Sequence, residues 1–212
     1  MRWSRAFAGI GLALALAGCG AVDGSIRTAA APADEVAAEA LVEVPLAVQD
    51  VTVTVPRSLK VSEAEVFYPV ADIVWRGEPR GDRYAQIEAI YEAAVTAAVV
   101  PLTAGLPVVA EIEVTRFHAV TDKTRYTVGG VHSLKFLLTI RDAATGKVLS
   151  GPRLVNADVR AVGGQRAVRN DYVGISQKEI VTNRLATVIR AELASLKVAP
   201  ALAATLTAVP AE

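Results

Sequence analysis

The segment Val108-Val109-Ala110-Glu111-Ile112-Glu113-Val114-Thr115 decides the fold class. Its apolar residues recur at every second position, which is the period of a half-buried β-strand. Glu111 and Glu113 occupy the opposite face, so we expect that face to contact water and the sheet to be mainly antiparallel, with one covered face. Phe117 breaks the alternation, which predicts a β-bulge near Arg116.

Further strand signals flank this segment on both sides. After it, residues 134–141 alternate in the same way, Asp142 to Gly146 has the composition of a hairpin turn, and residues 148–159 are predicted to return as a third strand. Before it, valines alternate with threonines over residues 51–55, and residues 70–76 form a second short apolar segment. The sheet is therefore predicted to contain five strand segments.

Two amphipathic helices complete the predicted domain. The first begins at Asp82, a favourable N-cap residue, and ends before Pro101. The second follows Ser176-Gln177-Lys178-Glu179, which has the form of a capping box. Their apolar stripes consist of Tyr84, Ile87, Tyr91, Val95 and Ala98, and of Val181, Leu185, Val188, Ile189, Leu193 and Leu196. This order predicts an α+β fold, a two-layer sandwich with a mainly antiparallel sheet and both helices on one face.

The N-terminal residues have the pattern of a secretory signal. Arg2 and Arg5 precede an apolar run over residues 6–17, which is too short to span a bilayer. The run ends at Leu16-Ala17-Gly18-Cys19, which resembles the lipobox of bacterial lipoproteins. The alternative interpretation is an ordinary secretory signal with a chance cysteine.

The lipobox resemblance implies a covalent membrane anchor. It implies that Cys19 carries a diacylglyceryl group, that the chain is cleaved before Cys19, and that the new amino terminus is acylated. Gly20 follows the cysteine, which in that class favours the outer over the inner membrane. The expected location is thus the cell envelope, with the chain anchored by palmitate-type lipid and facing the periplasm. Accordingly, residues 1–18 are expected to be the signal peptide, 19–49 a lipidated flexible tether, 50–198 the α+β domain and 199–212 a disordered tail.

Composition excludes several classes of function. Without Arg2 and Arg5 the chain has 20 basic and 22 acidic residues, so it offers no basic field for nucleic acid. Cys19 is the only cysteine, and once acylated it leaves no thiol for a disulfide, a metal or nucleophilic catalysis. No cofactor and no catalytic residue are predicted.

Two polar loops are the candidate binding surface. The stretch 116–132 joins two long strands and contains both histidines and a dense set of charges, and the stretch 163–174 precedes the last helix. The candidate residues are Arg116, His118, Asp122, Lys123, Arg125, Tyr126, His132, Arg166, Arg169 and Tyr172. The first stretch is predicted to be either a polar hairpin that turns near Asp122-Lys123 and carries surface histidines, or a loop that binds a partner or ligand.

Catalytic interpretations of the same residues have little support. His118, His132 and Asp122 supply three groups that bind metals, but nothing in their spacing enforces a site, and no metal site is predicted. His132-Ser133 with Asp122 contains the members of a catalytic triad without a local signature that places them together.

With these elements assigned, the chain resembles an uncharacterised family of Gram-negative lipoproteins over roughly residues 50–195. The resemblance rests on Val55-Pro56-Arg57-Ser58-Leu59, on Asp72-Ile73-Val74-Trp75-Arg76-Gly77 and on the run from Val114 to His132. In architecture alone, the chain is distantly similar to ABC-type transport auxiliary lipoproteins and to curli-secretion lipoproteins. Neither resemblance supplies an activity, because fold does not determine function.

The sequence leaves three functions open. We expect first a non-enzymatic envelope lipoprotein that binds another envelope protein or assists transport. The alternative is a periplasmic binder of a lipid or other apolar small molecule, with the space between helices and sheet as the expected site. A metal-dependent hydrolase is the third.

Overall fold

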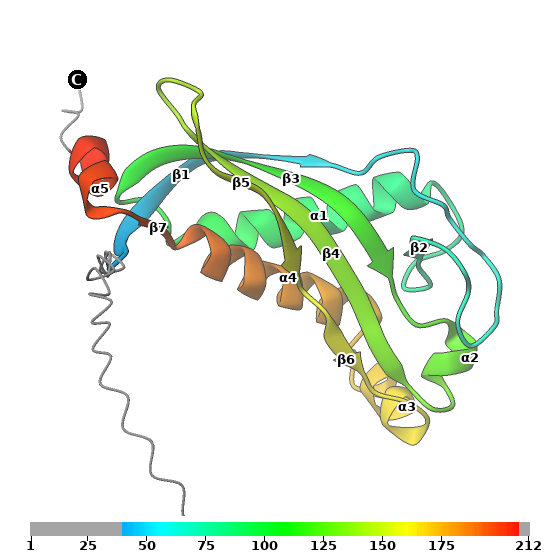
Figure 1. The fold of residues 1–212 in the computed structure, drawn as a ribbon. Coiled ribbons are helices and arrows are strands. Elements are labelled where there is room, and N and C mark those ends of the chain that lie inside the picture. The colour runs from blue at the N-terminus through cyan, green and yellow to red at the C-terminus, as the bar shows by residue number, and fades with distance from the viewer. Residues whose placement is uncertain (1–39, 208–212) are drawn as a thin grey trace, which may run out of the picture. The chain divides into compact units, whose positions relative to one another are not determined.

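The computed structural model describes residues 40–207, which form an α+β domain around one sheet (Figure 1). The sheet has seven strands, and its main path runs β5-β4-β3-β1-β7. These strands are β1 (Val42–Thr54), β3 (Leu106–His118), β4 (Gly130–Asp142), β5 (Val148–Asn156) and β7 (Ser195–Val198). Two short strands complete it: β2 (Ile73–Val74) pairs with β3, and β6 (Val159–Ala161) pairs with β4.

The sheet is mixed, which corrects the expectation of a mainly antiparallel one. β3, β4 and β5 form an antiparallel meander, as predicted, but β1 and β2 both run parallel to β3. The physical reason is the connection: the chain between β1 and β3 contains helix α1 (Arg83–Val99), and such a long crossover allows two neighbouring strands to run in the same direction. The alternation of apolar and polar side chains over residues 51–55 predicted which face of β1 is covered. It could not predict which strand pairs with β1.

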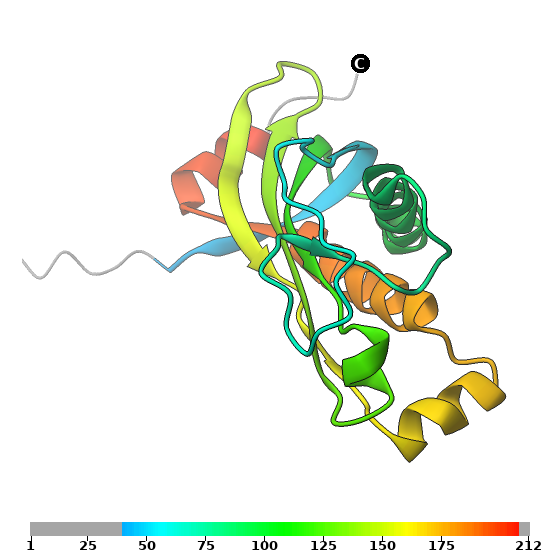
Figure 2. The ribbon, with the colours of Figure 1, turned by 90° about the vertical axis from the view of Figure 1, so that its right-hand side faces the viewer.

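Two helices cover one face of the sheet, as the apolar stripes predicted. α1 and α4 (Gln177–Leu193) lie side by side beneath the curved sheet (Figures 1 and 2). The core consists of the apolar stripes of these helices and the inward residues of the strands. Trp75, Tyr91, Phe117 and Phe136 are fully buried aromatic residues in it. The caps are confirmed: Asp82 accepts hydrogen bonds from the Tyr84 and Ala85 amides, and Ser176 accepts one from Glu179.

Details of the meander also agree with the sequence. The β3–β4 register shifts between Val114 and Arg116, which confirms the bulge, and Gly146 has a φ of 69° in the turn after Asp142. The returning strand is divided differently from the prediction, because it breaks at Ala157-Asp158 into β5 and β6. There, Leu134 donates its amide to the Asp158 side chain in place of a strand neighbour.

The predicted domain boundaries were wrong at both ends. β1 begins at Val42, inside the segment expected to be a tether, because Val44 and Leu46 are buried and Val42–Pro45 pairs with β7. Pro200–Thr207, expected to be part of a disordered tail, forms helix α5, in which Ala203 is buried against the core. The signal peptide, Cys19 and the rest of the tether lie outside the described residues. Within residues 40–207, no helix is long and apolar enough to cross a membrane.

Candidate docking surface

The first candidate loop contains a helical turn rather than the simple hairpin turn predicted at Asp122-Lys123. Helix α2 (Asp122–Arg125) begins after Thr121, whose hydroxyl accepts the Thr124 amide at 3.2 Å. The Thr124 carbonyl accepts the Gly129 amide at 2.8 Å, and Gly129 adopts a φ of 71°, which favours glycine. This local bonding gives the loop a fixed conformation and carries the chain into β4.

Both histidines are buried, so the interpretation of them as surface residues was wrong. His118 donates from Nε2 to the Pro69 carbonyl at 2.9 Å and stacks on Tyr68, with ring centroids 4.5 Å apart. His132 is fully buried, and its Nδ1 accepts the Val120 amide at 3.4 Å. His118 pairs with Ser133, the residue after His132, so the two imidazoles lie on opposite faces of the sheet. Among residues 40–207 no three metal-binding side chains cluster.

His132 is held in its neutral form. Burial, together with the nearby positive charge of Arg125, lowers its pKa to about 4. Because Nδ1 accepts a hydrogen bond, the proton of the neutral ring is on Nε2. Within the described residues Nε2 has no hydrogen-bond partner. His132 is therefore a buried polar residue that anchors the start of β4, and it does not contact solvent.

An ion pair between buried Arg125 and the partly exposed carboxylate of Asp171 joins the two candidate loops. Arg125 is buried, and its guanidinium bonds to the carboxylate of Asp171 in α3 (Gln165–Tyr172), a helix that the sequence analysis had interpreted as a loop. Tyr126 donates its hydroxyl to the same carboxylate at 3.1 Å, and the Arg125 carbonyl accepts the Gly164 amide at 2.9 Å. Stretches 116–132 and 163–174, separated in sequence, thus form one continuous surface.

The segment 61–72 packs on the other side of α2 and was not identified from the sequence. The Thr121 and Thr124 hydroxyls donate to the carbonyls of Val66 and Phe67, at 2.9 and 2.8 Å. The Lys123 ammonium lies 4.7 Å from the centroid of the Phe67 ring. Arg116 completes the contact by donating to the Tyr68 hydroxyl at 2.8 Å.

Two buried arginines hold this segment against the domain. Arg83 bonds to both carboxylate oxygens of Glu63, at 2.8 and 3.2 Å, and Arg76 pairs with Glu63 and Glu65. The hydrogen bond from Arg83 lowers the pKa of Glu63 despite the partial burial of that carboxyl group. The burial of these two side chains was not evident from the sequence, because charged residues are expected to face water.

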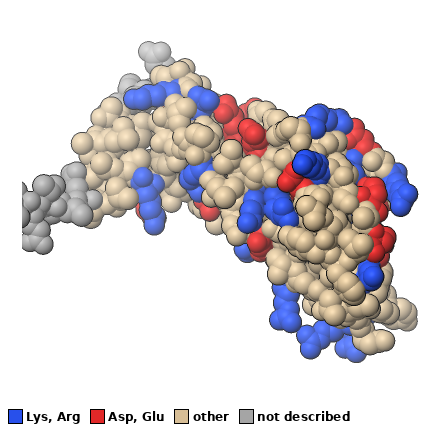
Figure 3. All heavy atoms as spheres, turned by 45° about the vertical axis from the view of Figure 1, so that its right-hand side comes forward, with Lys and Arg blue, Asp and Glu red and all other residues tan. Residues whose placement is uncertain are grey.

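The resulting surface, which we call the tip, comprises segment 61–72, α2, residues 126–131, α3 and residues 173–175. Its exposed apolar and aromatic side chains are Val61, Val66, Phe67, Tyr68, Val70, Tyr126, Val128, Val131, Val168, Tyr172, Val173 and Ile175. Tyr172 is 91% exposed and Val70 97%. Lys123, Arg166 and Arg169 are exposed beside them, and basic side chains gather at the lower end of the molecule in Figure 3.

The tip sorts the predicted site residues into two groups. Asp122, Lys123, Tyr126, Arg166, Arg169 and Tyr172 are exposed on it. His118, Arg125 and His132 are buried beneath it, and Arg116 is half-buried. Partial loss of solvent around the Asp122 carboxyl, with Glu65 nearby, raises the pKa of Asp122. The buried residues His118, Arg125 and His132 support the surface and cannot themselves contact a partner.

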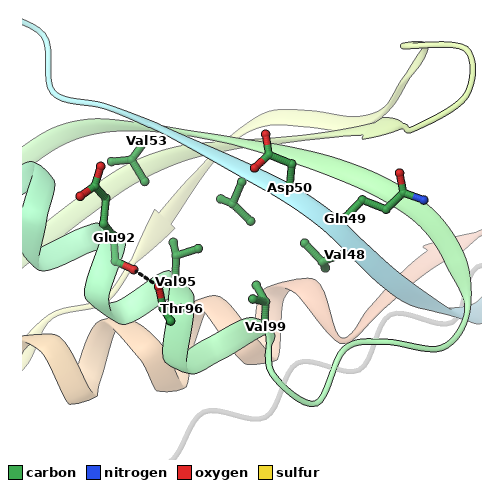
Figure 4. Close-up of a pocket in the computed structure, with 9 residues that line it drawn as sticks. Val48, Gln49, Asp50, Val53, Glu92, Val95, Thr96 and Val99 are labelled. Atoms are coloured by element: carbon green, nitrogen blue, oxygen red, sulfur yellow. Dashed lines mark hydrogen bonds between the residues drawn. The ribbon is translucent and has the colours of Figure 1, made fainter.

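A second feature is a groove between β1 and α1, away from the predicted loops. Its volume is about 310 Å³, and Figure 4 shows its residues as sticks. Valines from both elements line it: Val48, Val51, Val53, Val95 and Val99. Gln49, Asp50, Glu92 and Thr96 supply its polar groups.

Comparison with known protein families identifies the family of this chain. It matches a family of unknown function, DUF6778, over residues 46–208. The chain belongs to this family. The match begins within β1 and ends just after α5, so it covers all of the α+β domain except the first residues of β1. Membership agrees with the expectation of an uncharacterised family. A comparison with curated proteins finds no match.

Proposed function

We propose that the chain is a lipid-anchored protein of the bacterial envelope that has no catalytic activity and whose tip binds a protein partner, in the manner of a transport-accessory lipoprotein. The observation that carries the proposal is the tip itself, where tyrosines, valines and arginines are exposed together on a rigid support. Tyrosine and arginine are enriched in protein interfaces, and contiguous exposed apolar side chains mark interaction sites. The lipobox at residues 16–19 supports the anchor, with the outer membrane as its proposed location.

The position of the tip fits this role. β3 starts at Leu106, beside Leu46 near the start of β1, and ends at His118 beneath the tip. Twelve residue steps along an extended strand correspond to about 40 Å. The tip and the start of β1 therefore lie at opposite ends of the sheet (Figures 1 and 2). A chain anchored through Cys19 would enter the domain at the start of β1, at the end of the sheet opposite the tip.

Site-specific crosslinking in intact cells tests the proposal. A photoreactive phenylalanine analogue replaces Tyr172 on the tip or, as a control, Ala144 in the exposed turn between β4 and β5. We expect one distinct protein adduct from the Tyr172 position and none from the Ala144 position, because only the tip contacts the partner. Identical adducts from both positions, or none from either in cells that contain the anchored protein, would contradict the proposal.

The other two functions receive less support from the structure. Core side chains, from Val44 to Ala203, pack between the sheet and the helices of the described residues, and the valine-lined groove between β1 and α1 also carries carboxylates, which favours a lipid less. A hydrolase centred on the histidines is disfavoured by their burial on opposite faces of the sheet.

A further inference from the structure

One edge of β1 is open over the second half of the strand. β7 pairs only with Val42–Pro45, while β3 pairs with β1 from Leu46 to Thr54 on the other side. The amides of Leu46 and Val48 donate to the carbonyls of Ala194 and Leu102. From residue 49 to residue 54, the described part of the chain offers β1 no hydrogen-bonding partner except β3. Open strand edges readily accept an added strand.

The groove lies beneath this open edge. Val53 of β1 points toward α1, whose Val95 and Val99 face upward from the helix (Figure 4). A strand added beside residues 49–54 would extend the sheet over this part of α1. Its inward side chains would cover half-buried valines that now border solvent. The open stretch is six residues long, which corresponds to about 20 Å of extended chain.

The charge at the groove selects the chemistry of its occupant. Asp50 and Glu92 both line it, and neither carboxylate has a cationic partner among residues 40–207. Glu92 takes part in one hydrogen bond, in which its backbone carbonyl accepts the Thr96 hydroxyl at 2.9 Å (Figure 4). The two carboxylates border the groove from different elements, Asp50 on the face of β1 turned away from α1 and Glu92 on α1 (Figure 4). An occupant with lysine or arginine residues would place positive charge near them.

We propose that the β1–α1 groove binds an extended segment of a partner protein, with alternating apolar and basic residues, which adds to β1 as an edge strand. Main-chain hydrogen bonds to residues 49–54 provide affinity, and the valines and the two carboxylates select the side chains. The groove and the tip are separate surfaces. This inference therefore goes beyond the proposed function and does not depend on it.

Binding of a defined peptide to the full chain in lipid nanodiscs tests the inference. The probe is Lys-Val-Thr-Val-Lys-Val-Thr-Val. The first control is the same peptide with alternate amide nitrogens methylated, which cannot pair as a strand. The second replaces both lysines with glutamate. We expect only the unmodified probe to bind, and the amides within residues 49–54 to exchange hydrogen at least about tenfold more slowly in its presence.

Variants of the chain test whether the probe binds at the groove or at another surface. Val99→Lys places a charge on the valine floor and should abolish probe binding, while Val100→Lys, next to it but outside the groove, should not. Asp50→Asn with Glu92→Gln leaves the valines intact and should weaken binding about fivefold. Tyr172→Ala on the tip should leave probe binding unchanged, because the tip is a separate surface.

Four outcomes would overturn the inference. They are equal binding of the methylated peptide, probe-induced protection that falls outside residues 49–54, a dimer of the free protein in which these amides are already protected, and a co-purifying apolar molecule that the probe displaces. The third would assign the groove to a second copy of the chain, and the fourth to a small ligand.

Discussion

Arg125 determines how the tip is held together. Its guanidinium is buried beneath the surface and forms an ion pair with the carboxylate of Asp171. A buried charge is tolerated only when it is paired, so the ion pair ties α3 to α2 more firmly than an exposed pair would. The sequence marked Arg125 as a binding candidate, whereas its position assigns it a supporting role.

The two partners of this ion pair are not equivalent in their effect on stability. Asp171→Asn leaves a buried guanidinium without a counter-charge and should lower the free energy of unfolding by about 1–3 kcal/mol, a range reduced because the carboxylate is partly exposed. Arg125→Met keeps most of the packing volume, leaves no buried charge, and should cost less. Urea unfolding of both variants measures the difference. A larger loss for Arg125→Met would contradict this assignment.

His132 makes stability depend on pH. Its pKa is about 4 in the folded chain, against an ordinary value near 6.5, so the folded state favours the neutral ring. Its contribution is complete above pH 6.5 and is lost as pH falls toward 4. Between pH 7 and pH 5 the free energy of unfolding should decrease by about 2 kcal/mol from this residue.

The change at His132 is measured by comparison with His132→Leu. Both proteins are unfolded in urea at pH 7 and at pH 5. The carboxylates titrate in both proteins, so their contribution cancels when the two decreases in the free energy of unfolding are compared. The variant should show the smaller decrease between the two pH values, whatever its stability at pH 7. Equal decreases would mean that His132 is accessible to protons in the folded chain.

At the scale of elements, α3 is placed by a close backbone crossing. A Cβ atom on Gly163 would lie 2.1 Å from the amide nitrogen of Gly129, so the chain before α3 touches the chain before β4 with no room for a side chain. Because Gly129 and Gly163 have no side chains, the two segments can cross closely. The chain that leaves β6 therefore forms α3 next to α2. In the sequence, Gly129-Gly130 and Gly163-Gly164 indicate backbone freedom but not that the two segments cross.

A pair of glycine substitutions tests this crossing. Gly163→Ala should destabilise the domain by about 2 kcal/mol or more, because backbone atoms must move. Gly174→Ala is the matched control: its φ is 83°, but no atom lies within 4 Å of the added carbon, so it should cost only about 1 kcal/mol of backbone strain. Thermal unfolding compares the two. Equal losses would show that crowding at Gly163 is relieved by small shifts.

For the whole molecule, the proposed anchor and the two surfaces are separate properties of one chain. The tip is at the far end of β3 from the start of β1, and the groove runs along β1 itself. A partner at the tip and a strand at the groove could therefore bind the same molecule together. Both would be concentrated at the membrane if Cys19 is lipidated, since two or more acyl chains give stable anchoring.

Metabolic labelling tests the anchor. Cells supplied with radiolabelled palmitate should label the wild-type chain and not Cys19→Ser, because the thiol is the proposed attachment point. The variant should also leave the membrane fraction, while Ser25→Ala, a nearby control, should behave as the wild type. Equal labelling of wild type and Cys19→Ser would exclude lipidation at this residue.

The sequence by itself determined the elements whose signals are local. The alternation from Val108 to Thr115, the caps at Asp82 and Ser176, and the turn at Gly146 all predicted what the structure contains, because each depends on neighbours within a few residues. The same signals could not identify partners distant in the chain. The two tip loops were named as candidates, but nothing in their residues showed that Arg125 would meet Asp171 or that both histidines would be buried.

Only the tertiary structure decided the pairing and the surfaces. The alternation over Val51–Val55 predicted a strand, but its pairing with Ala110–Glu113, over Val51–Thr54, made it parallel to β3, and the shortness of β7 left its outer edge open. Side-chain period shows which face of a strand is buried, whereas backbone hydrogen bonds choose the neighbouring strand, and these bonds are nearly independent of side-chain identity. The groove and the tip depend on the tertiary structure in the same way, since both are made of segments that are distant in the sequence and meet only in the folded chain.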